Sequence, residues 1–349
     1  MKFRVKESLK VRIMNVLLTG GAGYIGSHTA VALINAGHTP VIYDNLCNSS
    51  KKVSKKIHAI TGLPVALVEG DVRDEFELNK VMATYAIDAV IHLAGLKAVG
   101  ESVKSPINYY LNNLVGAINL IKVMQYNNIK KIVFSSSATV YGRPKKLPID
   151  ESHSLHPASP YGNNKFQIEQ LLQDVVASDK EWSVLSMRYF NPSGAHESGF
   201  IGEDPRDTPN NLMPFILEVA SGKLKKIKIF GNDYETNDGT GVRDYIHVMD
   251  LAEGHVSALE RLNKINGYDV VNLGSGKGTS VKELIETFML VNGITIPYEV
   301  VERRPGDVAV CYADPKKAYE MLSWRSKRTI EEICKSSWKY KAMNKYEDI

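Results

Sequence analysis

Cysteine is scarce in this sequence, and the few cysteines form no pattern. Cys47, Cys311 and Cys334 are scattered over a chain of 349 residues, without the close spacing of metal ligands or of a disulfide framework. We therefore expect a reducing compartment, the cytoplasm. Long apolar runs are also missing, since no stretch approaches the roughly 18 residues that predict a membrane span. The basic start is followed only by "MNVLLTGG", which is typical of a strand and a loop rather than of a signal peptide.

An excess of one charge is missing too. The formal net charge is +4, and the densest basic cluster, "KKVSKK" at 51–56, is interpreted as the solvated face of a helix. No basic motif interleaved with aromatic residues supports nucleic-acid binding. With 44% hydrophobic and 23% charged residues, the chain can form one large or two modest globular domains. Residues 1–13, before Met14, are expected to be an extension, either disordered or not native.

Short apolar runs alternate with helical patterns in the first half of the chain. This rhythm predicts an α/β fold of the Rossmann type, a doubly wound parallel sheet with helices on both faces. We place the main domain at 14–190 and a smaller α/β lobe at 191–349, with segments that return to the main sheet. The strands are expected at 15–20, 39–44, 64–71, 88–95, 130–137, 182–190 and 269–275, and helices at 25–37 and 107–127 among others.

The first predicted strand runs into the glycine-rich loop "TGGAGYIG". Gly20, Gly23 and Gly26 there allow a tight turn and a close approach of the backbone to a pyrophosphate at a helix N-terminus. Asp44 ends the second strand, where a carboxylate accepts hydrogen bonds from ribose hydroxyls and disfavours a 2′-phosphate, so NAD is expected rather than NADP. The alternative is a glycine turn without a ligand.

Three further residues suggest proton transfer. Tyr161 and Lys165 lie four apart in "SPYGNNKF" and so share a helix face, and an ammonium group near a phenol lowers its pKa. Ser137 ends the fifth strand, at the edge where ligands bind in such sheets. Taken alone, the tyrosine and lysine could be a solvated helix face; with the glycine loop and Ser137 they predict a catalytic set. Asp71, after the third strand, could contact adenine or cap a helix.

Longer blocks carry a more specific resemblance. "HLAGLKAVGES" (92–102), "YFNPSGAHESGFIGED" (189–204), "PNNLMP" (209–214), "IFGNDYETNDGTGVRDYIHVMDLAEGH" (229–255) and "RRPGDVAVCYAD" (303–314) join the glycine loop and the Ser–Tyr–Lys set. Together they resemble the extended short-chain dehydrogenase/reductase superfamily and, within it, the UDP-glucose 4-epimerase family. The resemblance runs from about Asn15 to about Trp338.

The resemblance implies an NAD shell and a UDP-hexose site. The implied NAD shell comprises Gly20, Gly23, Tyr24, Ile25, Gly26, Asp44, Asn45, Leu46, Cys47, Asn48, Ser49, Asp71, Val72, Leu93, Ala94, Gly95, Leu96, Lys97, Asn112, Ser137, Tyr161, Lys165 and Phe190. The implied substrate site comprises Lys97, Ser137, Tyr161, Asn191, Asn211, Leu212, Arg243, Tyr245, Arg304, Asp307 and Cys311. Two arginines in this set suit a diphosphate, although each alone could be a surface ion pair.

The implied activity is NAD-dependent, reversible epimerisation at carbon 4 of UDP-hexoses through a 4-keto sugar, as in galactose metabolism. Family members restricted to non-acetylated hexoses tend to carry tyrosine where this chain has Cys311. The smaller residue implies that UDP-N-acetylglucosamine and UDP-N-acetylgalactosamine are also substrates, unless Cys311 is merely a small buried residue. The family further implies a homodimer formed through helices at 107–126 and 161–177.

Two other functions remain open at this point. A nucleotide-sugar 4,6-dehydratase shares the first hydride transfer, but related dehydratases place an Asp-Glu pair where this chain has Ala138 and Thr139. A non-catalytic NAD-sensing protein would be favoured by loss of the serine, tyrosine or lysine. His28, His92 and His247 lack ligand spacing, so they are interpreted as structural residues and no metal is expected.

Overall fold

The computed structural model describes residues 12–205, 209, 211–304 and 306–344. Most of the expected N-terminal extension, residues 1–11, lies outside the described residues. Met14 is already part of the folded core, with 2% of its surface exposed, and its backbone N–H donates to Nδ1 of His38 at 3.3 Å.

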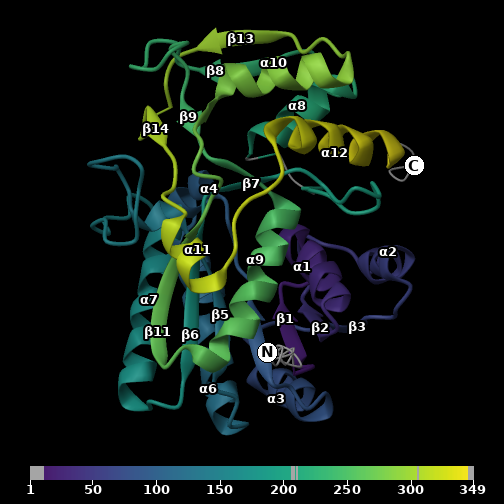
Figure 1. Cartoon of the computed structure of the whole chain (residues 1–349), viewed down its shortest axis with the longest axis vertical. Coiled ribbons are helices and arrows are strands. Elements are labelled where there is room, and N and C mark those ends of the chain that lie inside the picture. The colour runs from purple at the N-terminus through teal and green to yellow at the C-terminus, as the bar shows by residue number, and fades with distance from the viewer. Residues whose placement is uncertain (1–11, 206–208, 210, 305, 345–349) are drawn as a thin grey trace, which may run out of the picture.

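A central sheet of seven strands organises the molecule (Figure 1). Its order is β11-β6-β5-β4-β1-β2-β3, and every neighbouring pair is parallel. Each strand overlaps a run predicted from the sequence, so the doubly wound parallel fold is confirmed. The strands are β1 (Asn15–Thr19), β2 (Thr39–Asp44), β3 (Ala66–Glu69), β4 (Ala89–His92), β5 (Lys131–Ser137), β6 (Ser183–Tyr189) and β11 (Gly267–Leu273).

Helices cover both faces of this sheet because the strand residues alternate between two hydrophobic cores. Val16 and Leu18 of β1 belong to one core and Leu17 to the other. The first core is closed by α1 (Tyr24–Asn35), α2 (Lys52–Thr61), α9 (Val248–Arg261) and α11 (Lys316–Leu322), and the second by α3 (Glu75–Thr84), α6 (Gly116–Tyr126) and α7 (Pro160–Ser178). Burial on both faces explains why the strands read as continuous apolar runs.

The helix expected at 107–127 is interrupted. It consists of α5 (Pro106–Tyr109), a π-helical segment η1 (Tyr110–Val115) and α6, and it follows α4 (Val99–Lys104). The wider turn has a local use, because the Asn113 side chain accepts from Leu96 N at 2.8 Å and donates to Leu96 O at 3.0 Å. Helical periodicity predicts the length of this element but not such a bulge, which often occurs at functional sites.

A buried polar network fixes α7 to the sheet. Tyr161, Lys165 and Glu169 follow one another at intervals of four and therefore share one face of the helix. The Glu169 carboxylate accepts from Arg188 of β6 at 2.6 and 3.0 Å, and both side chains are almost fully buried. Ser136 of β5 also donates to Glu169. Removing one partner of such a pair costs roughly 3–5 kcal/mol, so the register of α7 against β5 and β6 is strongly specified.

Residues beyond β6 build a smaller lobe at the carboxyl edge of the sheet and also return to the sheet. Figure 1 shows α8, α10, α12, β8 and β13 above the main sheet, whereas β11 lies beside β6 within it. The remaining elements are β7 (Asn191–Ser193), α8 (Leu212–Ala220), β8 (Ile227–Phe230), β9 (Val242–Arg243), β10 (Tyr245–His247), η3 (Leu262–Lys264), β12 (Thr279–Ser280), α10 (Val281–Asn292), β13 (Tyr298–Val301), β14 (Val310–Cys311), α12 (Ile330–Met343) and the short turn η2 (Ala138–Val140) after β5.

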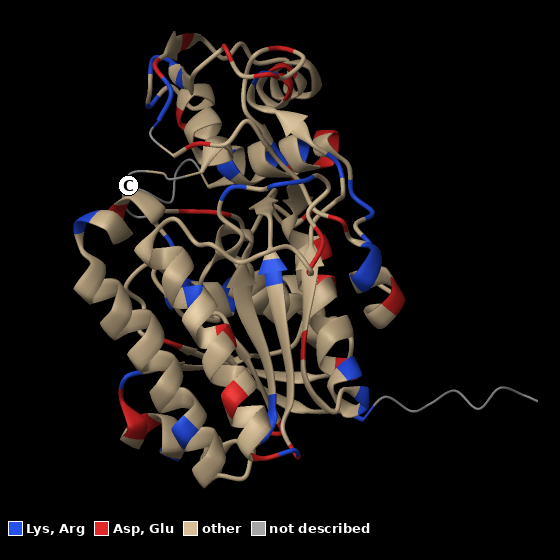
Figure 2. Ribbon diagram, turned by 90° about the vertical axis from the view of Figure 1, so that its left-hand side faces the viewer, with Lys and Arg blue, Asp and Glu red and all other residues tan. Residues whose placement is uncertain are grey.

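Charges of both signs are intermingled over the helices and loops on the face seen in Figure 2, in keeping with the small net charge. Among the helices of the described residues, none is both long enough and apolar enough to cross a membrane.

Candidate active site

A cleft of about 480 Å³ lies where β1, β2, β3 and β4 end. Its lining includes Gly20, Gly23, Tyr24, Ile25, Gly26, Asp44, Asn45, Cys47, Asn48, Ser49, Val72, Leu93, Ala94, Gly95, Leu96, Lys97 and Asn112, all of them residues expected to hold NAD. The other expected NAD residues, Leu46, Asp71, Ser137, Tyr161, Lys165 and Phe190, do not belong to this lining. The serine, tyrosine and lysine are nevertheless connected to it, because Ser135 lines the cleft and its carbonyl accepts from Lys165 Nζ at 2.5 Å.

The glycine loop forms a cradle that side chains would fill. Gly20 has φ +71°, and a Cβ there would lie 2.6 Å from Ala94 N; at Gly26 it would lie 2.4 Å from the Gly20 carbonyl oxygen. Gly23 is different, because its only close neighbour would be Gly20 O at 3.3 Å, and it stands at the N-terminus of α1, whose first turn holds no acidic residue. This arrangement suits a pyrophosphate beside the helix N-terminus.

Asp44 links the glycine loop to the end of β2. Its Oδ2 accepts from Ala22 N at 3.0 Å, while Oδ1 accepts from Leu46 N at 2.8 Å and Ser49 Oγ at 2.9 Å. The carboxylate lines the cleft but is only 8% exposed. A fixed negative charge here suits ribose hydroxyls and would repel a 2′-phosphate. The residues present therefore fit NAD.

Asp71 is not a helix cap. The cap of α3 is Asp74, which accepts from the N–H groups of Phe76 and Glu77. Asp71 instead pairs with the Arg73 guanidinium at 2.7 and 2.8 Å and accepts from Asn45 Nδ2 at 3.0 Å. The Arg73 bonds are the main reason that the pKa of Asp71 is well below its usual range. The contact of Asp71 with adenine stays a prediction. Its side chain is already fixed in place by Arg73 and Asn45.

Ser137, Tyr161 and Lys165 come together at the end of β5. Ser137 caps the turn η2, and Tyr161 stands in the first turn of α7, whose cap is Ser159. The Ser137 hydroxyl is close enough to Tyr161 to affect the pKa of the phenol, and Lys165 Nζ lies 5.9 Å from the centre of the tyrosine ring. The spacing of four along the helix and the strand-end serine thus bring a phenol, a hydroxyl and an ammonium group into one site.

The expected lowering of the tyrosine pKa by Lys165 is not found in this arrangement. Burial raises the pKa of Tyr161, and only the nearby Ser137 hydroxyl opposes this shift. Lys165 donates to the Ser135 carbonyl instead of the phenol, and burial lowers its own pKa to about 8, with Glu169 opposing the shift. The nicotinamide of NAD carries a positive charge, which would favour the phenolate.

Apart from Lys97, Ser137, Tyr161 and Cys311, the expected substrate residues form three groups on the smaller lobe. Asn191 and Tyr245 are partners on the paired strands β7 and β10. Asn211 and Leu212 begin α8, and Asn211 also lines the cleft. The third group surrounds Asp307: Arg304 Nε donates to Oδ2 at 2.9 Å, and Arg243 lies 3.9 Å from Oδ1. Two guanidinium groups facing one carboxylate are positioned to share an anionic ligand.

Cys311 lies close to this arginine group and to the catalytic turn. On β14 it stands opposite Arg243 of β9, and it packs against a cluster that contains Val140, Tyr141 and Phe190. Burial raises the pKa of its thiol to about 11. The thiol is therefore neutral near pH 7 and acts by its size, not as a nucleophile.

Several cleft residues were missed by sequence reasoning. Lys52 and Lys56 of "KKVSKK" line the cleft, a position that the interpretation of this cluster as a solvated face did not include. Lys51, Lys52 and Lys55 are exposed and Lys56 is half-buried; the two cleft lysines are four apart and therefore lie on one face of the helix. The segment 200–205 and Tyr340 also line the cleft, although they are distant in sequence.

The three singled-out histidines have structural partners. His92 Nδ1 bonds Thr19 Oγ1 at 2.7 Å, His28 Nδ1 bonds Tyr24 O at 2.7 Å, and His247 Nε2 bonds Ser336 Oγ at 3.2 Å. Within the described ranges, no cluster of three or more His, Cys, Asp or Glu side chains could hold a metal ion.

A parallel sheet with a glycine cradle, an acid at the ribose position and a Ser–Tyr–Lys set defines an enzyme of the extended short-chain dehydrogenase/reductase class. The model of the GDP-mannose 4,6 dehydratase family matches residues 17–337. A UDP-glucose 4-epimerase of Bacillus subtilis is 54% identical, over 95% of this chain and 98% of its own length. The chain belongs to the UDP-glucose 4-epimerase family.

Solved structures agree with this assignment. The UDP-glucose 4-epimerase of Stenotrophomonas maltophila with NAD and formylated UDP-arabinopyranose has a TM-score of 0.93 at 47% identity, covering 95% of this chain and 99% of its own. The Bifidobacterium longum enzyme with NAD+ and UDP has a TM-score of 0.92 at 50% identity, with the same coverage. A UDP-Glc/GlcNAc 4-epimerase of Campylobacter jejuni is 36% identical, with a TM-score of 0.82, over 95% of this chain and 99% of its own.

The lowered pKa of Lys165 predicts a stability difference that depends on pH. The unfolded chain holds this proton to about pH 10.4, whereas the folded chain loses it near 8. Between these values the unfolded state binds more protons, so the contribution of Lys165 to stability rises with pH. At pH 7 the buried charge is a cost, and Lys165→Met should raise the free energy of unfolding by about 1–3 kcal/mol after the lost hydrogen bond is subtracted.

Urea unfolding of the nucleotide-free protein at pH 7 and pH 10 checks this expectation. The gain should shrink at pH 10, where the native lysine is already neutral. The exposed Lys180 provides the control, since Lys180→Met should change little at either pH. A Lys165→Met variant that is less stable than the parent at pH 7, or equally stabilised at both pH values, would contradict the assigned cause.

Proposed function

We propose that this chain interconverts UDP-glucose and UDP-galactose by NAD-dependent epimerisation at carbon 4, a step of galactose metabolism. The carrying observation is that Tyr161, Ser137 and Lys165 stand together at the end of β5, and that Lys165 bonds Ser135, which lines a cleft that fits NAD. NAD, when bound, accepts a hydride from carbon 4 of the sugar and gives it back to the opposite face of the 4-keto sugar.

The chain's own contribution to chemistry is proton transfer and orientation. We assign Tyr161 as the group that takes the proton from the 4-hydroxyl and later returns one. Ser137, which lies near Tyr161, orients the same hydroxyl. Lys165 holds ribose hydroxyls and supplies positive charge once its ammonium turns from the Ser135 carbonyl toward the phenol.

Epimerisation requires a firmly held nucleotide and a sugar that can turn over. Arg243 and Arg304 are suited to the diphosphate, and Asn211 to uracil or ribose. We assign the same binding role to Asn191, Leu212, Tyr245, Asp307 and Lys97. In this division of labour, residues 14–190 supply most of the contacts to NAD and the lobe built from residues 191–349 supplies most of the contacts to the UDP-sugar. Because the arginines act on the diphosphate, the hexose itself stays free to present either face.

The dehydratase alternative is disfavoured by the turn after β5. Ala138 and Thr139 occupy the positions where the related dehydratases carry acids, and Thr139 Oγ1 instead donates to Ser137 Oγ at 3.0 Å. Elimination of water needs an acid and a base beyond the Ser–Tyr–Lys set. A non-catalytic NAD sensor would not need that set, and all three of its members are present at one strand end.

Acetylated UDP-hexoses are proposed as further substrates. Cys311 lies beside Phe190 and the turn that follows Ser137, and a thiol leaves room there that a phenol ring would occupy. The Campylobacter jejuni relative, described as acting on both Glc and GlcNAc forms, shows that the fold admits both substrate types.

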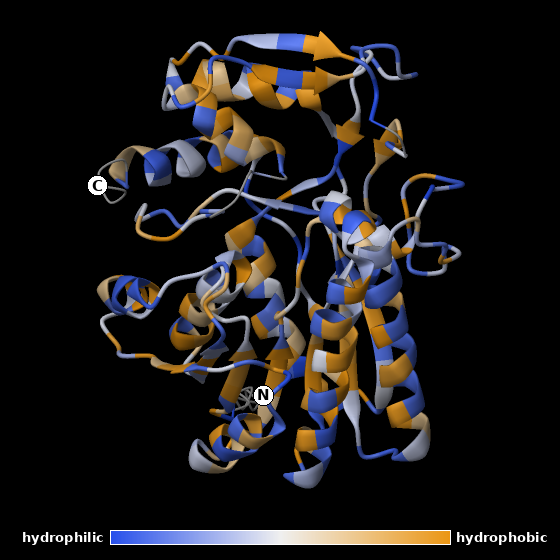
Figure 3. Cartoon of the chain, turned by 180° about the vertical axis from the view of Figure 1, so that it is seen from behind, coloured by the Kyte–Doolittle hydropathy of each residue, from blue (hydrophilic) through white to orange (hydrophobic). Residues whose placement is uncertain are grey.

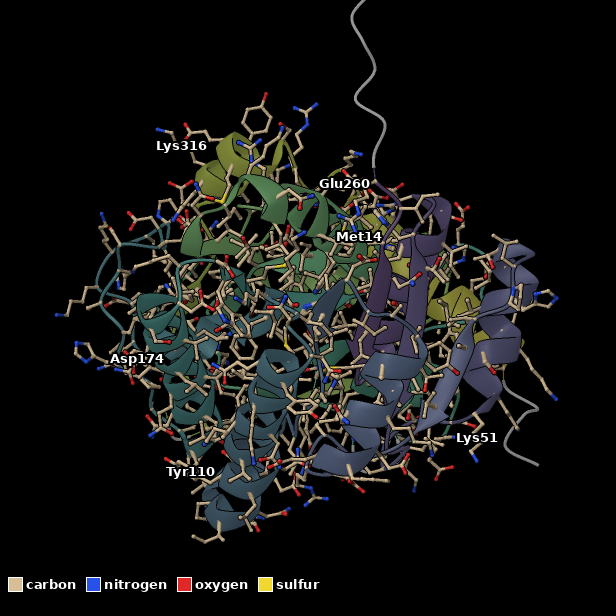
Figure 4. The ribbon with its side chains drawn as sticks, turned by 90° about the horizontal axis from the view of Figure 1, so that it is seen from below. Met14, Lys51, Tyr110, Asp174, Glu260 and Lys316 are labelled. Carbon is tan, nitrogen blue, oxygen red and sulfur yellow. The ribbon has the colours of Figure 1, made fainter. Side chains whose placement is uncertain are left out.

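A homodimer is proposed from an apolar stripe on α4, α5, η1 and α6. The stripe comprises Val99, Val103, Ile107, Leu111, Val115 and Ile118, which are 37–71% exposed; Figure 3 shows this helix column on the back of the molecule. The neighbouring α7 contributes less than expected, because its exposed residues, which are Gln170, Gln173, Asp174, Ala177 and Ser178, include no large apolar side chain. Tyr110 and Asp174, labelled in Figure 4, lie on this same side.

We also propose that the enzyme works in the cytoplasm. Its cysteines are all free, which suits a reducing compartment. Recovery of the native protein in a periplasmic or membrane fraction would contradict this location.

Tyr161→Phe tests the proposed function. The variant should fold and retain NAD but lose about a hundred- to ten-thousand-fold in turnover of UDP-galactose, because general acid–base assistance has that size. The check is a product assay for UDP-glucose together with absorbance of the bound nucleotide. Near-native turnover would remove Tyr161 from the mechanism.

Cys311→Tyr tests the range of substrates. The parent should interconvert both the plain and the N-acetylated UDP-hexoses, and the variant should lose only the acetylated pair through steric exclusion. Chromatographic product assays on the two pairs measure this. The proposal fails if the parent is inactive on UDP-N-acetylglucosamine, or if the variant loses both activities equally.

Ile107→Lys tests the dimer. Ile107 is 71% exposed in the middle of the stripe, so a buried charge there should shift the protein from dimer to monomer in sedimentation velocity. Leu290→Lys is the matched control, because Leu290 is 83% exposed on α10 of the other lobe. An Ile107→Lys variant that still sediments as a dimer would refute the placement.

A further inference from the structure

The segment 200–205 forms part of the wall of the cofactor cleft. It lines the cleft together with Gly23, Tyr24 and Lys97. Behind it stands the end of α12, so tightly that a Cβ at Gly202 would lie 2.5 Å from the Tyr340 ring. The segment therefore has a fixed rear support and one side turned toward the cofactor.

Further bonds tie this support together. The Asn344 side chain donates to Gly199 O at 3.0 Å and accepts from Lys56 Nζ at 3.0 Å. Lys339 Nζ donates to Glu197 O at 2.6 Å. The far side of the segment is thus anchored to α12 and, through Lys56, to the wall formed by α2.

On the cleft side, one carboxylate oxygen joins two other parts of the site. Oε1 of Glu203 accepts from Lys97 Nζ at 2.9 Å and from Asn211 Nδ2 at 2.8 Å. Lys97 belongs to the loop after β4, and Asn211 begins α8 of the smaller lobe. The Glu203 side chain is only 10% exposed, whereas that of Lys97 is 48% exposed. The Glu203 side chain is thus buried in the cleft wall, and the more exposed Lys97 side chain reaches it from the surface.

We propose that Glu203 is a positioning residue that latches the segment 200–205 over bound NAD, acting through Lys97 and Asn211. The latch is a feature of this chain's own contacts, and it rests on the proposed function only in that the cleft must hold NAD. Since NAD is regenerated in every catalytic cycle, a closed cleft spares the enzyme repeated loss and recapture of its cofactor.

The negative charge of Glu203, considered alone, predicts the opposite effect on the retention of NAD. Glu203 brings a negative charge to a cleft suited to a diphosphate, and its proximity contributes to the raised pKa of Tyr24 at the start of α1, which is mainly due to burial. If Glu203 acted only by repulsion, removing its charge would strengthen NAD retention. If Glu203 acts as a latch, removing its charge weakens retention. The sign of the change separates the two roles.

The experiment measures exchange of bound NAD for isotopically labelled NAD in the intact holoenzyme, followed by mass spectrometry. Glu203→Gln keeps an oxygen that can accept from Asn211 but loses the ion pair with Lys97. Exchange should become about three- to tenfold faster, in line with a partly buried ion pair. Asp204→Asn is the matched control: it removes the same charge from the adjacent, exposed residue of the cleft wall and should not speed exchange.

Salt provides a second readout that does not depend on any variant. Raising KCl from about 50 to about 500 mM screens the ion pair, so exchange in the parent should accelerate, and Glu203→Gln should lose most of that response. Unchanged or slower exchange in Glu203→Gln, equal acceleration in both variants, or a parent insensitive to salt would each overturn the latch. A parent that retains no NAD would instead overturn the proposed function.

Discussion

The buried ion pair between Glu169 and Arg188 is the constraint on which the reacting side of the molecule depends. Two charges removed from water are tolerated only in nearly ideal geometry, and here the guanidinium makes two bonds to one carboxylate. The same guanidinium bonds Tyr141, which in turn donates to Asn272 of β11 at 2.6 Å. One polar network therefore locks α7, β6, the turn after β5 and the edge strand into a single arrangement.

The geometry of the proposed catalytic residues depends on that ion pair. Lys165 stands one helical turn before Glu169, and Tyr161 one turn earlier still. With Glu169 fixed to β6, both side chains must point toward the carboxyl end of β5, where Ser137 lies. The burial that gives this precision also disfavours charge on both groups, raising the pKa of Tyr161 and lowering that of Lys165. The proposed site thus needs a positive charge near the phenol, from the nicotinamide or from a reoriented Lys165, to favour the phenolate.

Local sequence signals predicted most of the fold and about one wall of the site. Strands with apolar residues on both faces, such as β1 and β5, are recognisable because their patterns are set by burial alone. The glycine loop and Asp44 were recognisable because only a few residue types suit their backbone and ligand. Contacts between segments that are distant in sequence produce no local pattern from which they could be predicted. Nothing near Glu203 points to Lys97, and the π turn at Tyr110–Val115 preserves the apolar periodicity that predicts an ordinary helix.

The path of the chain between the two lobes limits how the molecule can move. The chain leaves the sheet after β6, comes back as α9 and β11, leaves again toward β12, and returns once more as α11 before ending in α12. Hinge motion needs only a few segments that connect the two lobes, placed close to one axis. Here the connecting segments are distributed along the crevice. The two lobes are therefore held against rotating apart about a hinge. Inversion at carbon 4 must then come from rotation of the small sugar within a stationary frame, so that the substrate, rather than the protein, is the moving part.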